Sequence, residues 1–344
     1  MTIKDIARLS GVGVSTVSRV LNDRPDVSEE SRRRVLQVIA EYNYLPNNSA
    51  RSLVRTKSDA VGLVVRGVQN PFYTGIIRAI ERDLDAADFT MVMRQIGSCE
   101  DEIKCGAMME REKRLQGIIF LGGRSDYSPA DTALLNVPFV CCSYTNTYGT
   151  LDPTKYSSVS IADEQEAYRA VMDLAQKGHR RIAVLSTDPR DRSIAQLRCS
   201  GYARALHDLG LSLEDGEIIR ADDFTIESAY RAVTERLKRP ADFTAIFAIS
   251  DDMAIGAMRA LRESGRSIPE DCSIIAIDGL TVSEYIYPML TTLCQPTDEM
   301  GARSVEILMS VIHGGTHRHL ILPTTLRTGQ SVRDLTRRFS RVNA

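Results

Sequence analysis

The sequence predicts an α/β protein with two doubly wound parallel sheets, preceded by a small all-α domain that contains a helix-turn-helix. Continuous apolar runs such as AVGLVV (60–65) and SIIAID (273–278) predict parallel strands that are covered on both faces. Helical stretches alternate with these runs in two successive series, which predicts two separate sheets. The apolar residues near the start of the chain instead follow helical spacing, and 344 residues suffice for two or three domains with sizeable cores.

The first two predicted helices are short and lie close together in the chain. Thr2 with Asp5 forms the pattern of a capped helix start, and the apolar residues that follow are spaced as in a helix. Gly11 is predicted to end this helix. Gly13 stands where the next helix begins, a position at which glycine is an acceptable N-cap.

The second helix has one apolar and one polar face. Val17, Val20 and Leu21 are predicted to be buried. A tight turn between two short helices leaves the other face convex, which suits the reading of a DNA major groove. An ordinary helical hairpin would show the same spacing, so the spacing alone leaves both interpretations open. The residues predicted to point outward are Val14, Ser15, Thr16, Ser18 and Arg19.

A third amphipathic helix starts at Ser28 and completes the helical region. Its spacing puts apolar residues on one side and arginines on the other. The residues predicted to point inward are Val35, Leu36, Val38 and Ile39, and those predicted to point outward are Arg32, Arg33 and Arg34.

The run from Thr2 to Lys57 resembles the amino-terminal pattern of the lactose/galactose repressor family without gaps. The matching segments are TIKDIARLSGV, TVSRVLN, VSEESRRRV and LPNNSARSL. The resemblance implies a helix-turn-helix domain over residues 1–46 and a hinge helix with a linker over residues 47–58. It also implies a repressor that binds a palindromic operator in double-stranded DNA as a homodimer. The DNA-binding residues that it implies are Thr2, Val14, Ser15, Thr16, Ser18, Arg19, Asn22, Asn47, Ala50, Leu53 and Arg55.

The hinge is expected to depend on DNA for its order. Residues 47–54 are too few to hold a helix alone, because helix nucleation costs more than so few hydrogen bonds return. The resemblance implies that two copies of this helix order at the operator centre, where Leu53 enters the minor groove as a wedge. A plain linker with one exposed leucine is the alternative that these residues alone would favour.

The charge distribution separates the start of the chain from the rest. Residues 1–58 hold ten Lys/Arg and six Asp/Glu, a net charge of +4, whereas the remainder holds 33 and 39, a net charge of −6. A basic head on an acidic body fits a phosphate-binding module attached to a part that does not touch DNA. Mild scatter of charge would also give a value of +4.

The rest of the chain carries motifs in the order of the same family. These are GHRRIAVL (178–185), RCSGYARAL (198–206), DDMAIGAMRAL (251–261), and DGL with YPMLTTLCQP (278–296). The core of that family looks like sugar-binding periplasmic proteins, so the resemblance implies two lobes joined by three crossovers around a cleft. VSI, near Ser158, is expected to begin the second series, and the strand after Thr291 to return to the first lobe. The expected lobes are 59–159 with 292–323, and 160–291 with 324–344.

Ligands of open α/β sheets bind beyond the carboxyl ends of the strands. Among the residues expected there, the family's pattern favours Arg198, Asp278 and Phe72, with Arg192 next. An arginine fork and an aspartate can clamp a polyhydroxylated or anionic ring, and an aromatic side chain can cover its apolar face. A surface ion pair is the alternative for each arginine. The expected effector-binding residues are Phe72, Ser143, Arg192, Arg198, Phe224, Ser250 and Asp278.

Three positions depart from the family's pattern. Ser250 stands where the family usually has Asn, Ser143 where it often has Asp, and Ala162 with Asp163 replaces the usual Asp-Asn pair. In the family these positions typically touch polar groups of the effector. A common hexose recognised through Asn and Asp is therefore disfavoured, and the expected class is a sugar, a nucleoside or a related polar metabolite.

Other classes of protein are disfavoured by what the sequence lacks. It contains no GxGxxG, GxxxxGK[ST] or GxSxG motif, so neither an enzyme on a doubly wound fold nor a cofactor is expected. Seven cysteines without CxxC and five histidines without metal spacing predict no metal site. The core alone would also suit a transport component. Charged residues interrupt the start of the chain and no apolar run approaches 18 residues, which favours a cytoplasmic protein without a membrane partner.

Overall fold

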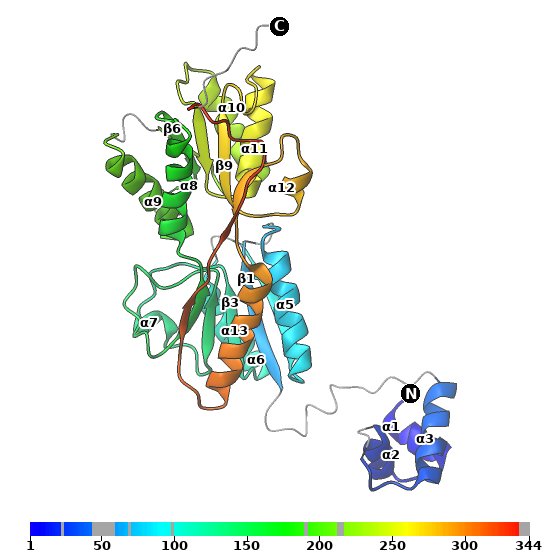
Figure 1. The fold of residues 1–344 in the computed structure, drawn as a ribbon. Coiled ribbons are helices and arrows are strands. Elements are labelled where there is room, and N and C mark those ends of the chain that lie inside the picture. The colour runs from blue at the N-terminus through cyan, green and yellow to red at the C-terminus, as the bar shows by residue number, and fades with distance from the viewer. Residues whose placement is uncertain are drawn as a thin grey trace. The chain divides into compact units, whose positions relative to one another are not determined.

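The computed structural model describes residues 1–21, 24–42, 59–67, 70–97, 100–188, 192–211 and 217–336. The chain divides into two units, residues 1–58 and residues 59–344, which we call the headpiece and the core (Figure 1). Each unit has apolar clusters of its own.

The headpiece consists of three helices, α1 (Ile3–Ser10), α2 (Val14–Leu21) and α3 (Glu29–Glu41). The predicted capping box at Thr2 and Asp5 is present, and Gly11 ends α1 in the left-handed conformation that glycine adopts without strain. The carbonyl of Gly13 accepts the first hydrogen bond of α2. The buried cluster that joins the helices comprises Ile6, Ala7, Val17, Val20, Val35 and Val38.

The prediction for Leu36 is wrong, because this side chain is 50% exposed. The buried side of α3 is defined by Val35 and Val38, with Ile39 partly buried beside them. Leu36 follows Val35 by one position, which turns it about 100° around the helix and away from this stripe. Arg33 and Arg34 are exposed as predicted, whereas Arg32 is half-buried.

The first sheet of the core has the strand order β11-β5-β4-β3-β1-β2, and its neighbouring strands run parallel. We call this sheet and its helices the first lobe. Helices α5 and α13 pack side by side on one face, and α6 covers the other (Figure 1). The strands are β1 (Ala60–Arg66), β2 (Thr90–Ile96), β3 (Gly117–Leu121), β4 (Phe139–Cys142), β5 (Ser157–Ser160) and β11 (His319–Ile321); the helices are α5 (Tyr73–Ala86), α6 (Glu102–Lys113), α7 (Pro129–Thr132) and α13 (Thr297–Ile312).

The second sheet has the strand order β12-β10-β9-β8-β6-β7, and only β12 runs antiparallel to its neighbour. With its helices it forms the second lobe, built around one large apolar cluster. The strands are β6 (Ile182–Ser186), β7 (Glu217–Arg220), β8 (Ala245–Ala248), β9 (Ser273–Asp278), β10 (Thr291–Cys294) and β12 (Thr325–Arg327); the helices are α8 (Asp163–Gln176), α9 (Ile194–Asp208), α10 (Ile226–Leu237), α11 (Asp251–Glu263) and α12 (Val282–Tyr285).

Two strands, β5 and β10, belong to a different sheet from the one predicted. β5 pairs with β4 and β11, so it ends the first sheet instead of beginning the second series. β10 pairs with β9 in parallel from Thr291 to Cys294, so the expected lobe boundary after Thr291 is wrong. The chain therefore passes between the sheets after β5, after β10 and after β11.

Glycine allows close helix contacts in the second lobe. A Cβ atom on Gly201 of α9 would lie 2.1 Å from the carbonyl oxygen of Glu164 in α8. A Cβ atom on Gly256 of α11 would lie 2.3 Å from the carbonyl oxygen of Ile226 in α10. Both contacts involve backbone atoms, which cannot rotate away as a flexible side chain can.

We predict that Gly201→Ala destabilises the core, although alanine favours helix more than glycine does. The added methyl group must push α8 and α9 apart, and overpacking of this kind costs about 1–3 kcal/mol. Thermal unfolding should show a lower melting temperature than for His207→Ala, a change at an exposed position of the same helix. Equal melting temperatures for the two variants would contradict the close packing of these helices.

Candidate DNA-binding surface and candidate effector site

The outer face of α2 carries the residues that the sequence analysis assigned to groove reading. Val14 is 42% exposed, Ser15 and Arg19 are exposed, and Thr16 and Ser18 are half-buried. Val17 and Val20 anchor the opposite face in the headpiece cluster. The helix thus presents a short, polar, convex surface of the kind that enters a major groove.

Arg19 is held only weakly in the absence of DNA. Its guanidinium lies 3.7 Å from the carboxylate of Asp26, and both side chains are exposed. Exposed ion pairs contribute little stability because water screens them. Arg19 can therefore exchange Asp26 for a base edge at little cost.

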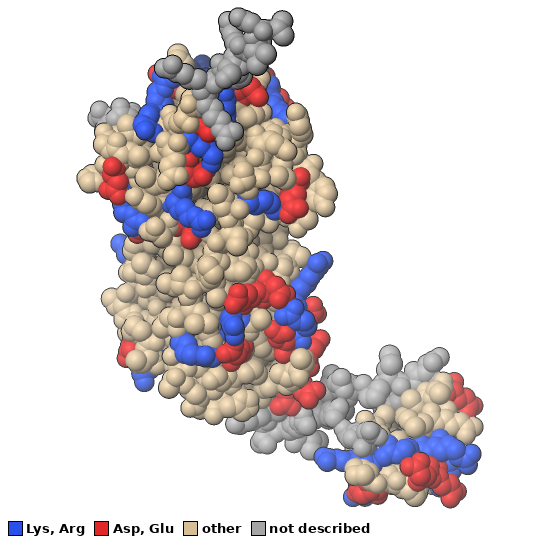
Figure 2. Space-filling model, in the orientation of Figure 1, with Lys and Arg blue, Asp and Glu red and all other residues tan. Residues whose placement is uncertain are grey.

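Thr2 lies at the start of α1, where its hydroxyl group donates to the Asp5 carboxylate over 2.8 Å. A helix start with amide groups of this kind suits a DNA phosphate. Figure 2 shows Lys and Arg side chains together on the visible face of the headpiece, with Asp and Glu beside them. The remaining predicted DNA-binding residues lie outside the described residues: Asn22, Asn47, Ala50, Leu53 and Arg55.

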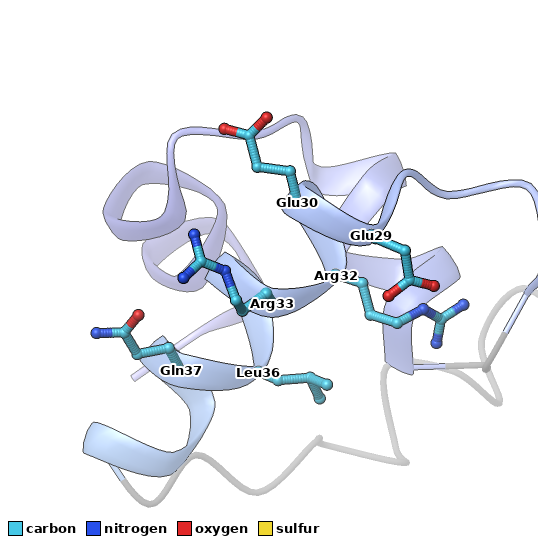
Figure 3. A pocket seen from close by; sticks show the side chains of 6 residues that line it. All are labelled: Glu29, Glu30, Arg32, Arg33, Leu36 and Gln37. Carbon is cyan, nitrogen blue, oxygen red and sulfur yellow. The ribbon is translucent and has the colours of Figure 1, made fainter.

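A hollow of about 610 Å³ lies on the headpiece, but it belongs to the outer face of α3 (Figure 3). All of its lining side chains come from this single helix, so it is open to solvent and does not enclose a ligand. We therefore do not assign the effector to it. The lining residues are Glu29, Glu30, Arg32, Arg33, Leu36 and Gln37.

The candidate effector site in the core is built around a buried arginine. Arg198 of α9 is only 1% exposed and lies between two aspartates. Its Nε donates to Asp163 of α8 over 2.8 Å, and its Nη1 lies 3.6 Å from Asp278 at the end of β9. Nη1 also donates to the carbonyl of Ile249, directly after β8. Four elements of the second lobe thus meet at one guanidinium group.

Asp278 combines burial with an unusual backbone. Its φ angle is 147°, a value that residues other than glycine rarely adopt and that functional sites often hold under strain. Gln295, directly after β10, donates to its carboxylate over 2.8 Å. Burial raises the pKa of Asp278 to about 8, with the positive charge of Arg198 opposing the shift. Burial also raises the pKa of Asp163. Burial disfavours the charged form of both carboxyl groups, and each can accept a hydrogen bond from a hydroxyl group.

The residues at the start of α11 hold the neighbouring loop. Ser250 caps the helix by accepting from the amide of Met253. Asp251 accepts from the amide of Leu280, and from the hydroxyl groups of Ser283 and Thr292. Asp251 is therefore saturated by internal contacts and positions the loop that follows Asp278.

Phe72 and Ser143, the two residues of the first lobe that were expected to bind the effector, are both buried. Phe72 is buried in the apolar cluster of this lobe and contacts the ring of Tyr73, with 5.7 Å between ring centroids. Ser143 is buried in a left-handed conformation, and its amide donates to Val159. Burial, together with the charge of Asp278, raises the pKa of Tyr73.

The structure groups some of the expected residues and separates others. Arg198, Asp278 and Ser250 belong to one polar cluster, because Arg198 bonds Ile249 next to Ser250. Arg192 is exposed, and its carbonyl accepts from the amide of Ser125 in the first lobe. Among the described residues, no hydrogen bond or ion pair joins Asp163, Arg198, Ser250 or Asp278 to Phe72, Ser143, Arg192 or Phe224; Phe224 packs against the second-lobe core.

Tyr73, Asp252 and Gln295 are among the residues of this region that the expected effector-binding residues do not include. The carboxyl-end rule points to the stretches Val68–Tyr73 and Ser250–Asp252, which contain Tyr73 and Asp252, but the family's pattern favoured other residues. Gln295 directly follows the predicted strand and lies in the quoted segment YPMLTTLCQP, but the prediction places that strand in the other lobe. Its contact with Asp278 follows only from the pairing of β10 with β9.

Fold and sites together define a class: a helix-turn-helix headpiece joined to a two-lobed core of the periplasmic-binding type. The family model for bacterial regulatory proteins of the lacI family matches residues 2–47, and that for the periplasmic binding protein-like domain matches residues 171–332. The chain is 40% identical over 329 residues to the HTH-type transcriptional regulator MalR of Clostridium butyricum, covering 95% of this chain and 97% of that protein. The chain belongs to the lacI family and is a DNA-binding transcription regulator.

Solved structures agree with this assignment. A Lac repressor dimer bound to operator and the anti-inducer ONPF has a TM-score of 0.80 at 26% identity, covering 97% of this chain and 99% of that chain. The complex of the regulator CelR with cellobiose has a TM-score of 0.69 at 30% identity, covering 96% and 99%. These similar proteins are regulators and not enzymes. In the described part of this chain, no helix is long and apolar enough to cross a membrane, and no group of side chains could hold a metal ion.

We predict that Arg198→Ala destabilises the core strongly. The substitution leaves Asp163 buried without its cation, and breaking a buried pair in this way costs about 3–5 kcal/mol. The matched control is Arg259→Ala, which removes an exposed pair with Glu263 of similar length and should cost less than about 1 kcal/mol. Urea unfolding followed by far-UV circular dichroism measures both. Similar losses in the two variants would show that the buried cluster does not depend on Arg198.

Proposed function

We propose that this regulator is a repressor whose operator affinity is set by a sugar bound at the carboxyl ends of the two core sheets. The observation that carries this proposal is the buried group formed by Asp163, Arg198 and Asp278. It supplies forked donors and paired acceptors at the edge where open α/β sheets bind ligands. The complex of CelR with cellobiose supports a sugar as the ligand class.

The proposed sugar contacts follow from the chemistry of the site. Arg198 donates to two ring oxygens, and Asp278 accepts from a hydroxyl group. Ser250 and Ser143 add small polar groups, one from each lobe. Phe224 is half-buried and covers the apolar face of the ring, while Arg192 covers the entrance. Phe72 supports Tyr73 from the apolar core and does not itself touch the ligand.

The proposed DNA complex has two-fold symmetry. A homodimer places one copy of α2 in each half-site of a near-palindromic operator on the bacterial chromosome, and so acts in the cytoplasm. Arg19 reads a guanine edge, and Val14, Ser15, Thr16, Ser18 and Asn22 set the neighbouring positions. Residues 47–58 form the hinge, with Leu53 as the minor-groove wedge beside Asn47, Ala50 and Arg55.

The proposed domain organisation follows the observed sheets. The helix-turn-helix domain covers residues 1–46. The first lobe covers residues 59–160 and 295–323, and the second covers residues 161–294 and 324–344. Three connections between the lobes let a ligand favour one closure angle, which sets the spacing of the two hinges in the dimer. Only a difference in sugar affinity between the DNA-competent and incompetent forms can produce this control.

We predict that Arg19→Ala weakens operator binding by about 1–3 kcal/mol and relaxes specificity at one symmetric base pair. The guanidinium supplies a bidentate contact that alanine cannot replace. Selection from random DNA followed by titration of single base-pair variants measures this effect. A loss that is uniform over all sequences would assign Arg19 to phosphate contact instead.

We predict that Asp278→Asn abolishes the sugar response and leaves operator binding by the free protein nearly normal. The asparagine oxygen keeps the Gln295 contact, but the side-chain amide places a donor where the carboxyl group can accept from a ligand hydroxyl group. Operator titrations with and without maltose, cellobiose or ribose test this, with Asp222→Asn on an exposed loop as the control. A normal response of the Asp278 variant to a sugar that controls the wild type would remove Asp278 from the proposed site.

A further inference from the structure

Asp252 is a buried carboxylate without a hydrogen-bond donor for one of its oxygens. It lies in the first turn of α11 and is only 7% exposed. Its Oδ1 is fully buried and has no hydrogen-bond partner among the described residues. Leaving a buried acceptor unsatisfied is costly, so native proteins normally satisfy such groups with internal donors, water or a ligand.

The neighbouring carboxylates do not share this property. Asp251 accepts from three donors, and Asp163 and Asp278 both face the guanidinium of Arg198. Asp252 is thus the member of this group with a carboxylate oxygen that no described residue supplies with a donor. Its place one residue beyond Asp251 puts it at the carboxyl end of β8, beside the proposed site.

The polar cluster of the second lobe contains more acid than base. Among the described residues, Asp163, Asp251, Asp252 and Asp278 are four buried acids, whereas the arginines paired with them are Arg198 and, 3.9 Å from Asp251, Arg327. The acidic side chains affect one another's pKa: burial and the charge of Asp251 raise the pKa of Asp252 to about 6. The charge of Asp252 also helps to raise the pKa of Asp278.

The other lobe does not reverse this excess. Arg66 of this lobe is half-buried, acts on Tyr73 and lies 3.7 Å from the buried carboxylate of Glu102. Arg192 carries a positive charge at the surface between the lobes, where it is exposed to water. Arg198 and Arg327 already pair with acidic side chains, so an anionic ligand group beside the buried acids would find no unpaired cation among the described side chains of this cluster.

We propose that Asp252 accepts a hydrogen bond from a hydroxyl group of the effector, and that the surrounding acids make the site select uncharged sugars over phosphorylated ones. The inference rests on the proposed function, because it concerns the same site. A hydroxyl group satisfies Oδ1 of Asp252 without adding charge, whereas a phosphate group supplies acceptors where the site needs a donor.

The test uses the full-length protein and isothermal titration with maltose, cellobiose, glucose and ribose, and with glucose 6-phosphate and ribose 5-phosphate. We expect at least one uncharged sugar to bind, and to bind more tightly than the phosphorylated sugars. Asp252→Ala should weaken this binding about 10- to 100-fold, the usual loss for a hydrogen bond to a charged group. The exposed control Asp222→Asn should leave it unchanged.

A second measurement separates a direct contact from a structural effect. Deoxy analogues of the sugar that binds each lack one hydroxyl group. One analogue should bind the wild type about 10-fold more weakly than the parent sugar does. The same analogue and the parent sugar should bind Asp252→Ala equally well, because this variant lacks the carboxylate that the missing hydroxyl group would contact. Asp252→Asn keeps the shape and an acceptor, so it should bind the sugar more tightly than Asp252→Ala and discriminate less against phosphate.

The outcomes distinguish this inference from the proposed function. Tighter binding of a phosphorylated sugar, or unchanged sugar affinity in Asp252→Ala, overturns the inference and leaves a sugar effector in place. If no sugar or sugar phosphate binds the wild type or changes its operator affinity, the proposed sugar control fails, and the inference fails with it.

Discussion

The contact between Arg198 and its two aspartates is the interaction on which the second lobe depends. A guanidinium that is 1% exposed is tolerated only when carboxylates and carbonyl groups replace its water. Here Asp163, Asp278 and the carbonyl of Ile249 do so, and they come from α8, β9 and the end of β8. The arginine that would hold a ligand thus also holds the elements that surround the ligand, so binding and packing share one set of contacts.

This arrangement gives a physical route from ligand to DNA. The chain passes between the two sheets three times, and the polar cluster lies at the end of the second sheet from which one of these connections starts. Gln295 begins that connection and bonds Asp278, while Tyr73 approaches Asp278 from the other lobe. A ligand that changes these contacts changes the relative stability of different lobe arrangements, which is the requirement for control at a distance.

Particular residues show how far sequence reasoning could reach. The capping box at Thr2, the end of α1 at Gly11 and the buried stripe of α2 depend on neighbours within four positions, and these predictions are confirmed. Leu36 failed because an apolar residue next to a buried one was assigned to the same face, although one helical position changes the direction by about 100°. Arg198 and Asp278 were found through the family's motifs; Asp252 and Gln295 were not.

The sequence by itself determined the local elements and their type, because caps, apolar periodicity and strand-forming runs act over short distances in the chain. Only the tertiary structure decided which sheet each strand joins: a short buried strand such as β5 or β10 can add to either sheet, and pairing with β4 or β9 makes the choice. The same holds for the site. Residue types indicate which side chains can bind a polar ligand, but burial and missing partners, as at Asp252, arise only when distant segments meet.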